Sequence, residues 1–309
     1  MVDLGVMFRR EQPPETLCEF ARQAEAVGLA ELWIVEDCFY ASGIASVATA
    51  LACTEHIKVG LGIAPAVMRN AALTAMEFAT LARMYPGRFL PGIGHGVREW
   101  MDQIGALPPS QLTALEEVSL AVRALLRGET LHMTGGYVKL EDVTLEFPPS
   151  DVPPVQLGVR GEKSLRLSGR SADGTLLTEG SGPAYVRWAR EQIAAGQAEA
   201  GHPGAPHRVT VYAWSLLGAD SQAARDAVRP TVAQTMPYIW KQLAPLGIVD
   251  EAQAILDAQG FEGFAAAMPD EWLDLLAIAG TPEDCAAGVQ RLVAAGADAV
   301  VFAPPHEHV

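Results

Sequence analysis

Two adjacent carboxylates, Glu36 and Asp37, end an apolar run near the start of the sequence. The run is LWIV, residues 32–35, and the full stretch reads LWIVEDCFY. A buried acid is costly unless it is paired or hydrogen-bonded, so these two acids need partners at that end of the molecule. A carboxyl group placed there can give or take a proton during a reaction. The structural alternative is that Asp37 caps the next helix and Glu36 forms an ion pair with Arg9.

His95 is a second candidate for chemistry. It stands between two glycines in GIGHG, residues 92–96, where the pattern predicts the end of another strand. Imidazole titrates near neutral pH, which suits a residue that carries a proton. The alternative is a hydrogen-bonded structural histidine at a tight strand exit, where glycine is also favoured.

The stretch GVRGEKS, residues 158–164, has the pattern of an anion site. It reads as a strand end, a glycine turn and the start of a helix. Backbone N–H groups at a helix N-terminus bind anions, and Gly161 allows a phosphate to approach closely. Arg160 or Lys163 would add positive charge. The alternative is an ordinary turn between a strand and a helix, because such turns also favour glycine.

The composition indicates an acidic protein with a large hydrophobic core. Of the 309 residues, 50% are hydrophobic and 19% are charged, and the formal net charge is −15. Such an acidic surface repels phosphate backbones, which argues against nucleic acid as a partner. The apolar stretches end well before the ~18 residues of a membrane span, and the N-terminus lacks a signal-peptide layout. We therefore expect a cytoplasmic protein without a membrane or nucleic-acid partner.

Cysteine and histidine spacing predicts no metal site. The cysteines are scattered along the chain at Cys18, Cys38, Cys53 and Cys285. No pair has C-x-x-C spacing, so we expect neither a zinc site nor a redox dithiol, but reduced thiols in a cytoplasmic protein. The histidines other than His95, including His306 and His308, show no ligand-like pairing with acids or thiols.

The elements that must position these residues alternate along the whole chain. Short apolar runs with strand character are each followed by a segment with helical periodicity. The expected strands cover residues 3–8, 32–35, 57–63, 88–94, 155–159, 174–178, 208–217 and 299–303. The expected helices cover approximately residues 14–27, 42–54, 71–84, 112–126, 162–171, 183 onward, 221–232, and the segment that ends at Gly296.

Eight strands with intervening helices predict an α/β fold, a parallel (β/α)8 TIM barrel, rather than a doubly wound open sheet. Two segments interrupt the pattern. Residues 131–147 alternate apolar and polar around Gly135-Gly136 and predict a β-hairpin insertion. Residues 233–280 predict a helical insertion after the seventh strand. The whole chain, residues 1–309, is then a single domain, and no helix is expected in the few residues after the eighth strand.

The carboxyl ends of the strands are where a TIM barrel places its chemistry. The candidate site therefore gathers residues that follow six different strands. They are Arg9, Glu36, Asp37, Gly62, Ile63, Ala64, His95, Gly96, Val97, Gly158, Val159, Arg160, Gly161, Thr178 and Glu179.

Several stretches resemble the luciferase-like flavin-dependent oxidoreductases. The likeness is greatest to the branch that uses the 8-hydroxy-5-deazaflavin coenzyme F-420, which includes methylenetetrahydromethanopterin reductase. It extends over nearly the whole chain and identifies the family but no substrate. The stretches that carry it are LWIVEDCFY with Gly43-Ile44, residues 75–101, residues 158–191 and residues 280–302.

The resemblance implies a deazaflavin, or alternatively FMN, at the carboxyl ends of the strands. Gly158–Gly161 would hold its phosphate, and Gly62-Ile63 falls where the family often has a non-prolyl cis peptide bond behind the ring. Glu36 and Asp37 fall where the deazaflavin branch commonly has an Asp-His pair, so Asp37 replaces a common histidine. The implied catalytic residues are Asp37, Glu36 and His95. The implied cofactor contacts are Gly62, Ile63, Ala64, His95, Gly96, Val97, Gly158, Val159, Arg160, Gly161, Thr178 and Glu179.

Three functions remain open from the sequence. The first is hydride transfer between a reduced deazaflavin and a small organic substrate. The others are an FMN-dependent monooxygenase and a non-catalytic flavin-binding protein that has lost its proton-transfer group. The resemblance also implies a homodimer, formed through the helices at residues 42–54 and 71–84. Substrate contacts are expected from residues 131–147 and 233–280.

Overall fold

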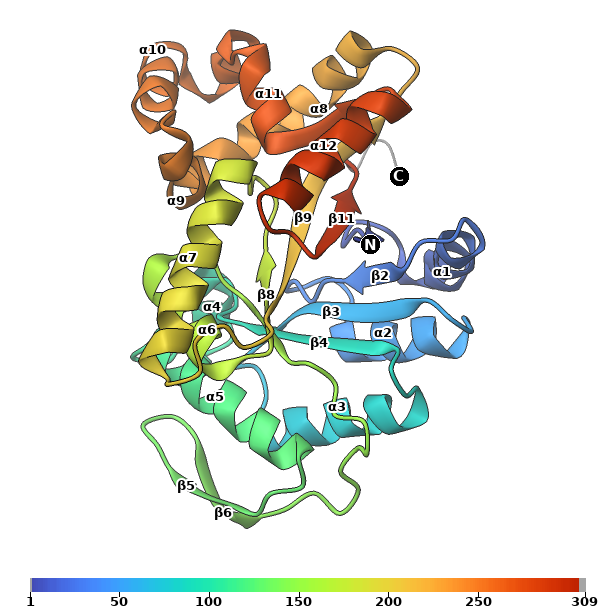
Figure 1. The fold of residues 1–309 in the computed structure, drawn as a ribbon, viewed down its shortest axis with the longest axis vertical. Helices are drawn as coiled ribbons and strands as arrows, with labels where there is room; N and C mark the ends of the chain where they lie inside the picture. The colour runs from blue at the N-terminus through green and yellow to red at the C-terminus, as the bar shows by residue number, and fades with distance from the viewer. Residues whose placement is uncertain (1, 306–309) are drawn as a thin grey trace.

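The computed structural model describes residues 2–305, and its strands close into a ring. The barrel strands run parallel to their neighbours, and β9 closes the ring by pairing with both β8 and β11. Figure 1 shows these strands in the middle of the molecule with helices around them. In order around the ring, the eight strands are β1 (Asp3–Phe8), β2 (Glu31–Ile34), β3 (Lys58–Pro65), β4 (Phe89–Gly94), β7 (Gln156–Gly158), β8 (Gly174–Leu177), β9 (Arg208–Leu217) and β11 (Ala299–Ala303). The predicted TIM barrel is confirmed.

The helices follow the strands as the alternation predicts. Local caps fix some of their starts: the side chain of Asn70 accepts a hydrogen bond from Ala72 N at 2.9 Å, and Thr281 with Asp284 forms a capping box. The predicted bounds of the helices at residues 71–84 and 162–171 are confirmed without change. The main helices are α1 (Leu17–Ala26), α2 (Gly43–Ala52), α3 (Ala71–Met84), α5 (Gln111–Leu126), α6 (Glu162–Ser171), α7 (Pro183–Glu199), α8 (Ser221–Thr235) and α12 (Pro282–Ala294).

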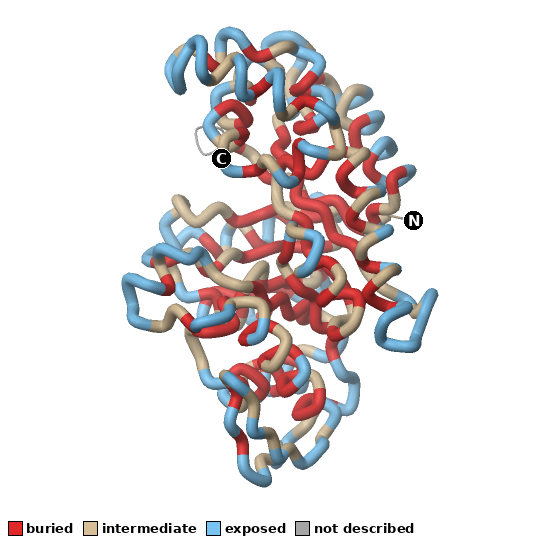
Figure 2. The backbone as a smooth tube through the Cα atoms, turned by 90° about the vertical axis from the view of Figure 1, so that its left-hand side faces the viewer, coloured by how far each residue is buried: buried red, intermediate tan, exposed pale blue. Residues whose placement is uncertain are grey.

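Buried side chains fill the barrel and the layer between the strands and the helices. Figure 2 shows the buried backbone concentrated in the central strands and the inner turns of the helices. Inside the barrel, the Trp33 ring meets the Tyr212 ring edge-on, with centroids 5.6 Å apart. Gly60 makes room for this indole, because a Cβ atom there would lie 2.3 Å from Trp33. Large aromatic side chains thus close the barrel beneath the functional end.

The predicted β-hairpin insertion is confirmed. It consists of β5 (Leu131–Thr134) paired antiparallel with β6 (Lys139–Val143), and it lies beside α5 in Figure 1. Glu117 on α5 accepts hydrogen bonds from three successive backbone N–H groups at residues 136–138, at 2.7 to 2.8 Å. Burial opposes ionisation of Glu117, but these three hydrogen bonds lower its pKa below the usual range. One ionised side chain therefore fixes the hairpin to the barrel.

The helical insertion after β9 is also confirmed, and its apolar side chains form one hydrophobic cluster with side chains of the barrel strands. It contains α9 (Trp240–Leu243), α10 (Val249–Ala267) and α11 (Asp270–Leu276), which cap the top of the molecule in Figure 1. The cluster includes Met236, Leu243, Phe264 and Trp272, packed against Trp214 of β9. Gln242 is buried and donates to the backbone oxygens of Thr178 and Glu179, at 3.3 and 2.9 Å. The insertion is thereby attached to the loop after β8.

Two short elements were not predicted. The strand β10 (Ala277–Gly280) pairs with β9 outside the ring, and α4 (Arg98–Gln103) follows β4. The expectation that no helix follows the eighth strand concerns residues 304–309, of which only Pro304 and Pro305 are described, and neither is helical. No helix within residues 2–305 has the length and apolar composition needed to cross a membrane.

Candidate active site

A cavity of about 1100 Å³ opens at the carboxyl ends of the barrel strands. It is large enough for a cofactor and a substrate together, since ligand pockets typically measure ~300–1,000 Å³. Of the residues predicted for the site, only Ala64 is absent from its lining, because this side chain is 2% exposed and packs in the barrel core. The predicted residues that line the cavity are Arg9, Glu36, Asp37, Gly62, Ile63, His95, Gly96, Val97, Gly158, Val159, Arg160, Gly161, Thr178 and Glu179.

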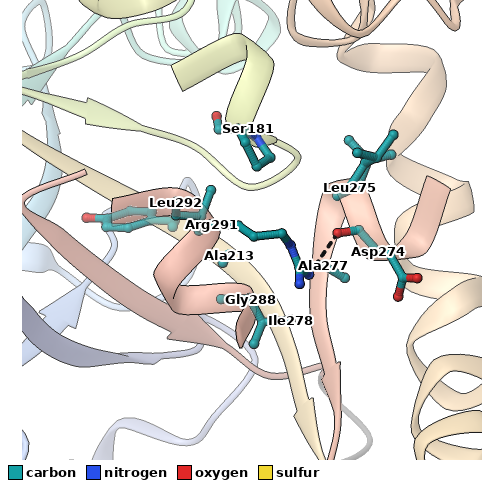
Figure 3. Close-up of a pocket in the computed structure, with 12 residues that line it drawn as sticks. Ser181, Ala213, Asp274, Leu275, Ala277, Ile278, Gly288, Arg291 and Leu292 are labelled. Atoms are coloured by element: carbon teal, nitrogen blue, oxygen red, sulfur yellow. Dashed lines mark hydrogen bonds between the residues drawn. The ribbon is translucent and has the colours of Figure 1, made fainter. Parts of the chain in front are cut away.

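A second pocket near the helical insertion is far too small for a cofactor. It lies between the loop after β8, the strand β10 and the helix α12, as Figure 3 shows. Its volume is about 10 Å³, close to that of one water molecule. Arg291 crosses it and donates a hydrogen bond to the backbone oxygen of Asp274 at 3.1 Å. The large cavity is therefore the candidate active site.

Ile63 forms an apolar ledge in the wall of the large cavity. The pairing register of β3 with β4 shifts at this point, and the Gly62–Ile63 peptide bond is cis, as the family resemblance implied. Glycines on the neighbouring strands leave room for the side chain. A Cβ atom at Gly158 would lie 2.5 Å from Ile63 Cγ2, and one at Gly94 would lie 2.8 Å from Ile63 Cγ1. The ledge is thus set by three adjacent strands and suits a flat ring.

Positive groups gather at the turn after β7. Gly161 precedes the first turn of α6, whose free N–H groups favour an anion. Lys241 of the helical insertion reaches the same point, because a Cβ atom at Gly161 would lie 3.4 Å from its Nζ. Arg160 and Lys163 also line the cavity here. We call Gly161, the N-terminus of α6 and Lys241 the anion cradle. Lys241 was not predicted, since a lone lysine in a helical stretch gives no signal in sequence.

His95 supports this cradle through hydrogen bonds. Its Nδ1 lies 3.2 Å from the carbonyl oxygen of Gln111, and its Nε2 lies 2.9 Å from Ser164 Oγ on α6. A carbonyl oxygen can only accept, so Nδ1 carries the proton and Nε2 accepts from the hydroxyl. Burial lowers the pKa of His95, the hydrogen bond to Gln111 opposes this, and the nearby charge of Lys241 lowers it further. A neutral imidazole therefore holds the first turn of α6 in place.

Glu36 is held in a clamp by Arg69. Two guanidinium nitrogens donate to its two carboxylate oxygens at 2.6 Å each, and Gly43 N donates at 2.9 Å. The side chain of Glu36 is 5% exposed and that of Arg69 is 19% exposed. The expected ion pair between Glu36 and Arg9 is therefore wrong, and so is the expected helix cap by Asp37. The acid that reaches the start of α2 is Glu36, because only its longer side chain turns inward to Gly43.

Asp37 lies at the entrance of the cavity and pairs with Arg10. The Arg10 Nη1 atom is 2.7 Å from Asp37 Oδ2, and Arg10 also bonds to Glu11 at 2.9 Å. Its guanidinium stacks over the rings of Tyr40 and Trp100, at 5.2 and 5.9 Å from their centroids. Asp37 is 31% exposed, so solvent and substrate can both reach it. Arg10 was not predicted, although it lies two residues after the end of β1.

Arg9 faces another acid, Glu179, which follows β8. The Arg9 Nη1 atom lies 3.6 Å from Glu179 Oε1, and the Arg9 guanidinium lies over the Trp214 ring at 5.2 Å. Both residues line the cavity.

No metal site is found in the described part of the chain: residues 2–305 contain no group of three histidine, cysteine, aspartate or glutamate side chains that could hold an ion. His306 and His308 lie outside the described residues.

Comparison with known proteins places this geometry in a family. The model of the family described as luciferase-like monooxygenase matches residues 2–299. A 5,10-methylenetetrahydromethanopterin reductase from Methanolobus tindarius is 30% identical over 308 residues, which are 97% of this chain and 94% of that protein.

Two solved structures agree in fold. A coenzyme F420-dependent tetrahydromethanopterin reductase from Methanopyrus kandleri gives a TM-score of 0.85 at 24% identity, covering 99% of this chain and 95% of that one. An F420-dependent secondary alcohol dehydrogenase, solved with an F420-acetone adduct, gives 0.81 at 21% identity, covering 98% and 93%. The predicted family is thus confirmed: the chain belongs to the luciferase-like monooxygenase family and is an oxidoreductase.

Proposed function

We propose that this enzyme transfers a hydride between reduced coenzyme F420 and a small organic substrate. The observation that carries the proposal is the cavity itself, which combines the anion cradle with the apolar ledge of Ile63. A phosphate-bearing flat ring needs both features. Three relatives are named as F420-dependent glucose-6-phosphate dehydrogenases, which supports the deazaflavin over FMN.

The chain's own groups would hold such a cofactor by charge and shape. The N–H groups of the first α6 turn and Lys241 would bind the phosphate, and the Ile63 ledge would support one face of the ring. When bound, the reduced coenzyme supplies the hydride. The other predicted contacts with it are Gly62, His95, Gly96, Val97, Gly158, Val159, Arg160, Thr178 and Glu179.

The three catalytic candidates differ in how free they are to act. Glu36 already accepts three hydrogen bonds, and His95 is hydrogen-bonded at both ring nitrogens. We therefore expect both residues to hold neighbouring groups in position and not to exchange protons with a substrate. Asp37 has a cavity-facing carboxylate and one arginine partner, which suits an acid that orients the substrate. We therefore keep Asp37 as the catalytic candidate among these three.

The substrate is the least defined part of the proposal. The relative at 30% identity is named for 5,10-methylenetetrahydromethanopterin, so a reduced pterin is the first substrate class to test. Trp100, which lines the cavity, would stack on such a flat molecule, and the Tyr40 ring lies against the same Arg10 guanidinium as Trp100. A cytoplasmic location accords with this chemistry and stays a prediction.

A cofactor titration tests the proposal. Purified protein is titrated with F420 and, separately, with FMN, while the absorbance of each chromophore is followed. We expect saturable binding of F420 and at least tenfold weaker binding of FMN, and then oxidation of reduced F420 when a substrate is added. Preferred binding of FMN would favour the monooxygenase alternative. Binding of F420 without turnover of any substrate would favour the non-catalytic alternative.

We also propose that two copies associate through α2 and α3. The outer face of α3 exposes Leu73, Met76 and Met84, which are 51%, 52% and 62% exposed in the isolated chain. Apolar side chains grouped on one helix favour a covered interface. Sedimentation at micromolar concentration should give twice the 32.8 kDa of one chain. A single species of 32.8 kDa would rule the dimer out.

A further inference from the structure

Four polar residues meet on the cavity wall away from the anion cradle. Arg9 directly follows β1, Glu179 follows β8, and Tyr212 and Trp214 lie on β9. All four line the cavity. We call them the Glu179 cluster. Neither the cradle nor the Asp37–Arg10 pair uses their polar groups.

Glu179 is fixed in position but poorly paired. Its backbone oxygen accepts a hydrogen bond from Gln242 at 2.9 Å, which holds the loop. Within residues 2–305, no side chain donates a hydrogen bond to its carboxyl group, and the nearest cation, Arg9, is 3.6 Å away. Arg9 is shared with Glu11, whose Oε2 lies 3.4 Å from its Nε, so its charge offsets that of Glu179 only in part.

Two hydrogen-bond donors beside Glu179 are also unpaired. Tyr212 is 3% exposed and Trp214 is 7% exposed, and neither the Tyr212 hydroxyl nor Trp214 Nε1 has a partner in the described part of the chain. The hydroxyl lies directly against Gly62, where a Cβ atom would be 1.8 Å from it. Buried polar groups are almost always hydrogen-bonded, so two unpaired donors beside the Glu179 carboxyl group on one cavity wall indicate a ligand that binds them.

The surroundings of Glu179 favour its protonated form. Burial raises its pKa, and Arg9 lowers it in part. Of the charges further away, Asp37 raises the pKa and Arg10 lowers it, and the net direction is upward. Burial likewise raises the pKa of Tyr212, and the charge of Glu179 adds to this, so the Tyr212 hydroxyl keeps its proton and can donate a hydrogen bond.

We propose that Glu179 is the proton donor of this site, with Tyr212 and Trp214 binding the substrate's polar end. The inference rests on the proposed function. The substrate is a compound whose reacting carbon is bonded to an oxygen or nitrogen that must take up a proton. Bound F420 would supply the hydride, and Glu179 gives the proton to the heteroatom. A C–H bond and a heteroatom–H bond form, while one of the bonds between the carbon and the heteroatom is broken. The carboxylate left behind is stabilised by Arg9, and water reprotonates it.

The first test needs no substrate. Infrared spectra of the cofactor-free protein at pH 7 should contain the carbonyl band of a protonated carboxylic acid, with a component that Glu179→Gln removes. Any component from another buried acid, such as Glu31 beside Arg208, stays in the variant. The control is Glu199→Gln, a surface acid paired with Arg166 at 3.1 Å, which should leave the whole band unchanged. A spectrum in which Glu179→Gln loses nothing would overturn the proposal.

The second test uses turnover of reduced F420 with 5,10-methylenetetrahydromethanopterin as the probe. At saturating F420, Glu179→Gln should lower kcat by about 10²-fold or more, the range for a lost general acid. The high-pH decline of kcat in the wild type should vanish in the variant. Unchanged kcat with bound F420 would overturn the role of Glu179 alone, whereas absence of F420 binding to the wild type would overturn the proposed function.

Discussion

Removing Arg69 tests whether Glu36 is a structural residue. In Arg69→Met, the carboxylate of Glu36 stays buried with one remaining partner, the N–H group of Gly43. Breaking one side of a buried ion pair costs about 3–5 kcal/mol. Arg69 is 19% exposed, which lets water replace part of the lost interaction, so we expect about 3 kcal/mol. Glu36→Gln keeps the side-chain size and one acceptor, so its expected cost is about 1.5–3 kcal/mol.

Urea unfolding of the two single variants and the double variant measures these values. The double variant should cost less than the sum of the singles by about 2 kcal/mol, because both changes remove the same interaction. Arg127 and Glu129 provide a matched control, since they also meet at 2.6 Å but are 47% and 51% exposed. Arg127→Met and Glu129→Gln should each change the free energy of unfolding by ~1 kcal/mol or less.

Unchanged stability together with weaker ligand binding would show that Glu36 is not a structural residue. If Glu36→Gln unfolds at the same urea concentration as the wild type but binds F420 or substrate much more weakly, Glu36 serves the ligand directly. The clamp by Arg69 would then orient a binding group instead of joining β2 to α2 and α3.

Three further outcomes follow from the same geometry. Lys241→Met should weaken F420 binding about tenfold by calorimetry, the effect of one charged hydrogen bond, and equal affinity would exclude Lys241 from the cradle. Gly158→Val should lose about 1–3 kcal/mol of stability by overpacking against Ile63, and Ile63→Ala should restore part of it in a double variant. Burial lowers the pKa of His207 to about 4, below its unfolded value of about 6.5, so stability present above pH 6.5 falls by about 3 kcal/mol as the pH drops toward 4. His207→Gln should flatten this part of the curve in urea titrations at successive pH values.

The sequence predicts the barrel well because its local signals agree with one another. Strands such as residues 3–8, 208–217 and 299–303 are apolar runs bounded by turn residues, and their observed bounds equal the predicted ones. The hairpin at residues 131–147 was equally clear from its alternation. The strand β10 was missed because its four residues, AIAG, are too short and too small to show a period.

The sequence predicted which residues gather at the candidate site, but it did not predict which acidic and basic side chains form ion pairs there. The rule that chemistry lies at the carboxyl ends of the strands was enough to bring the predicted residues, apart from Ala64, to one cavity. Which acid meets which arginine depends on side chains far apart in the chain, such as Glu36 with Arg69. Lys241 enters from an insertion whose packing no local pattern encodes. The pairing of charges is therefore a property of the tertiary structure.

A titration that compares F420 affinity in the wild type and in Gly161→Val tests whether the anion cradle binds the F420 phosphate. The valine side chain fits without disturbing the fold, because its Cβ atom would contact only Lys241, 3.4 Å from the Nζ atom at the end of that flexible side chain. It would nevertheless displace the lysine and cover the N–H groups of α6. We expect an unchanged melting temperature, with F420 binding at least tenfold weaker than in the wild type. Equal F420 affinity in the two proteins would contradict this expectation.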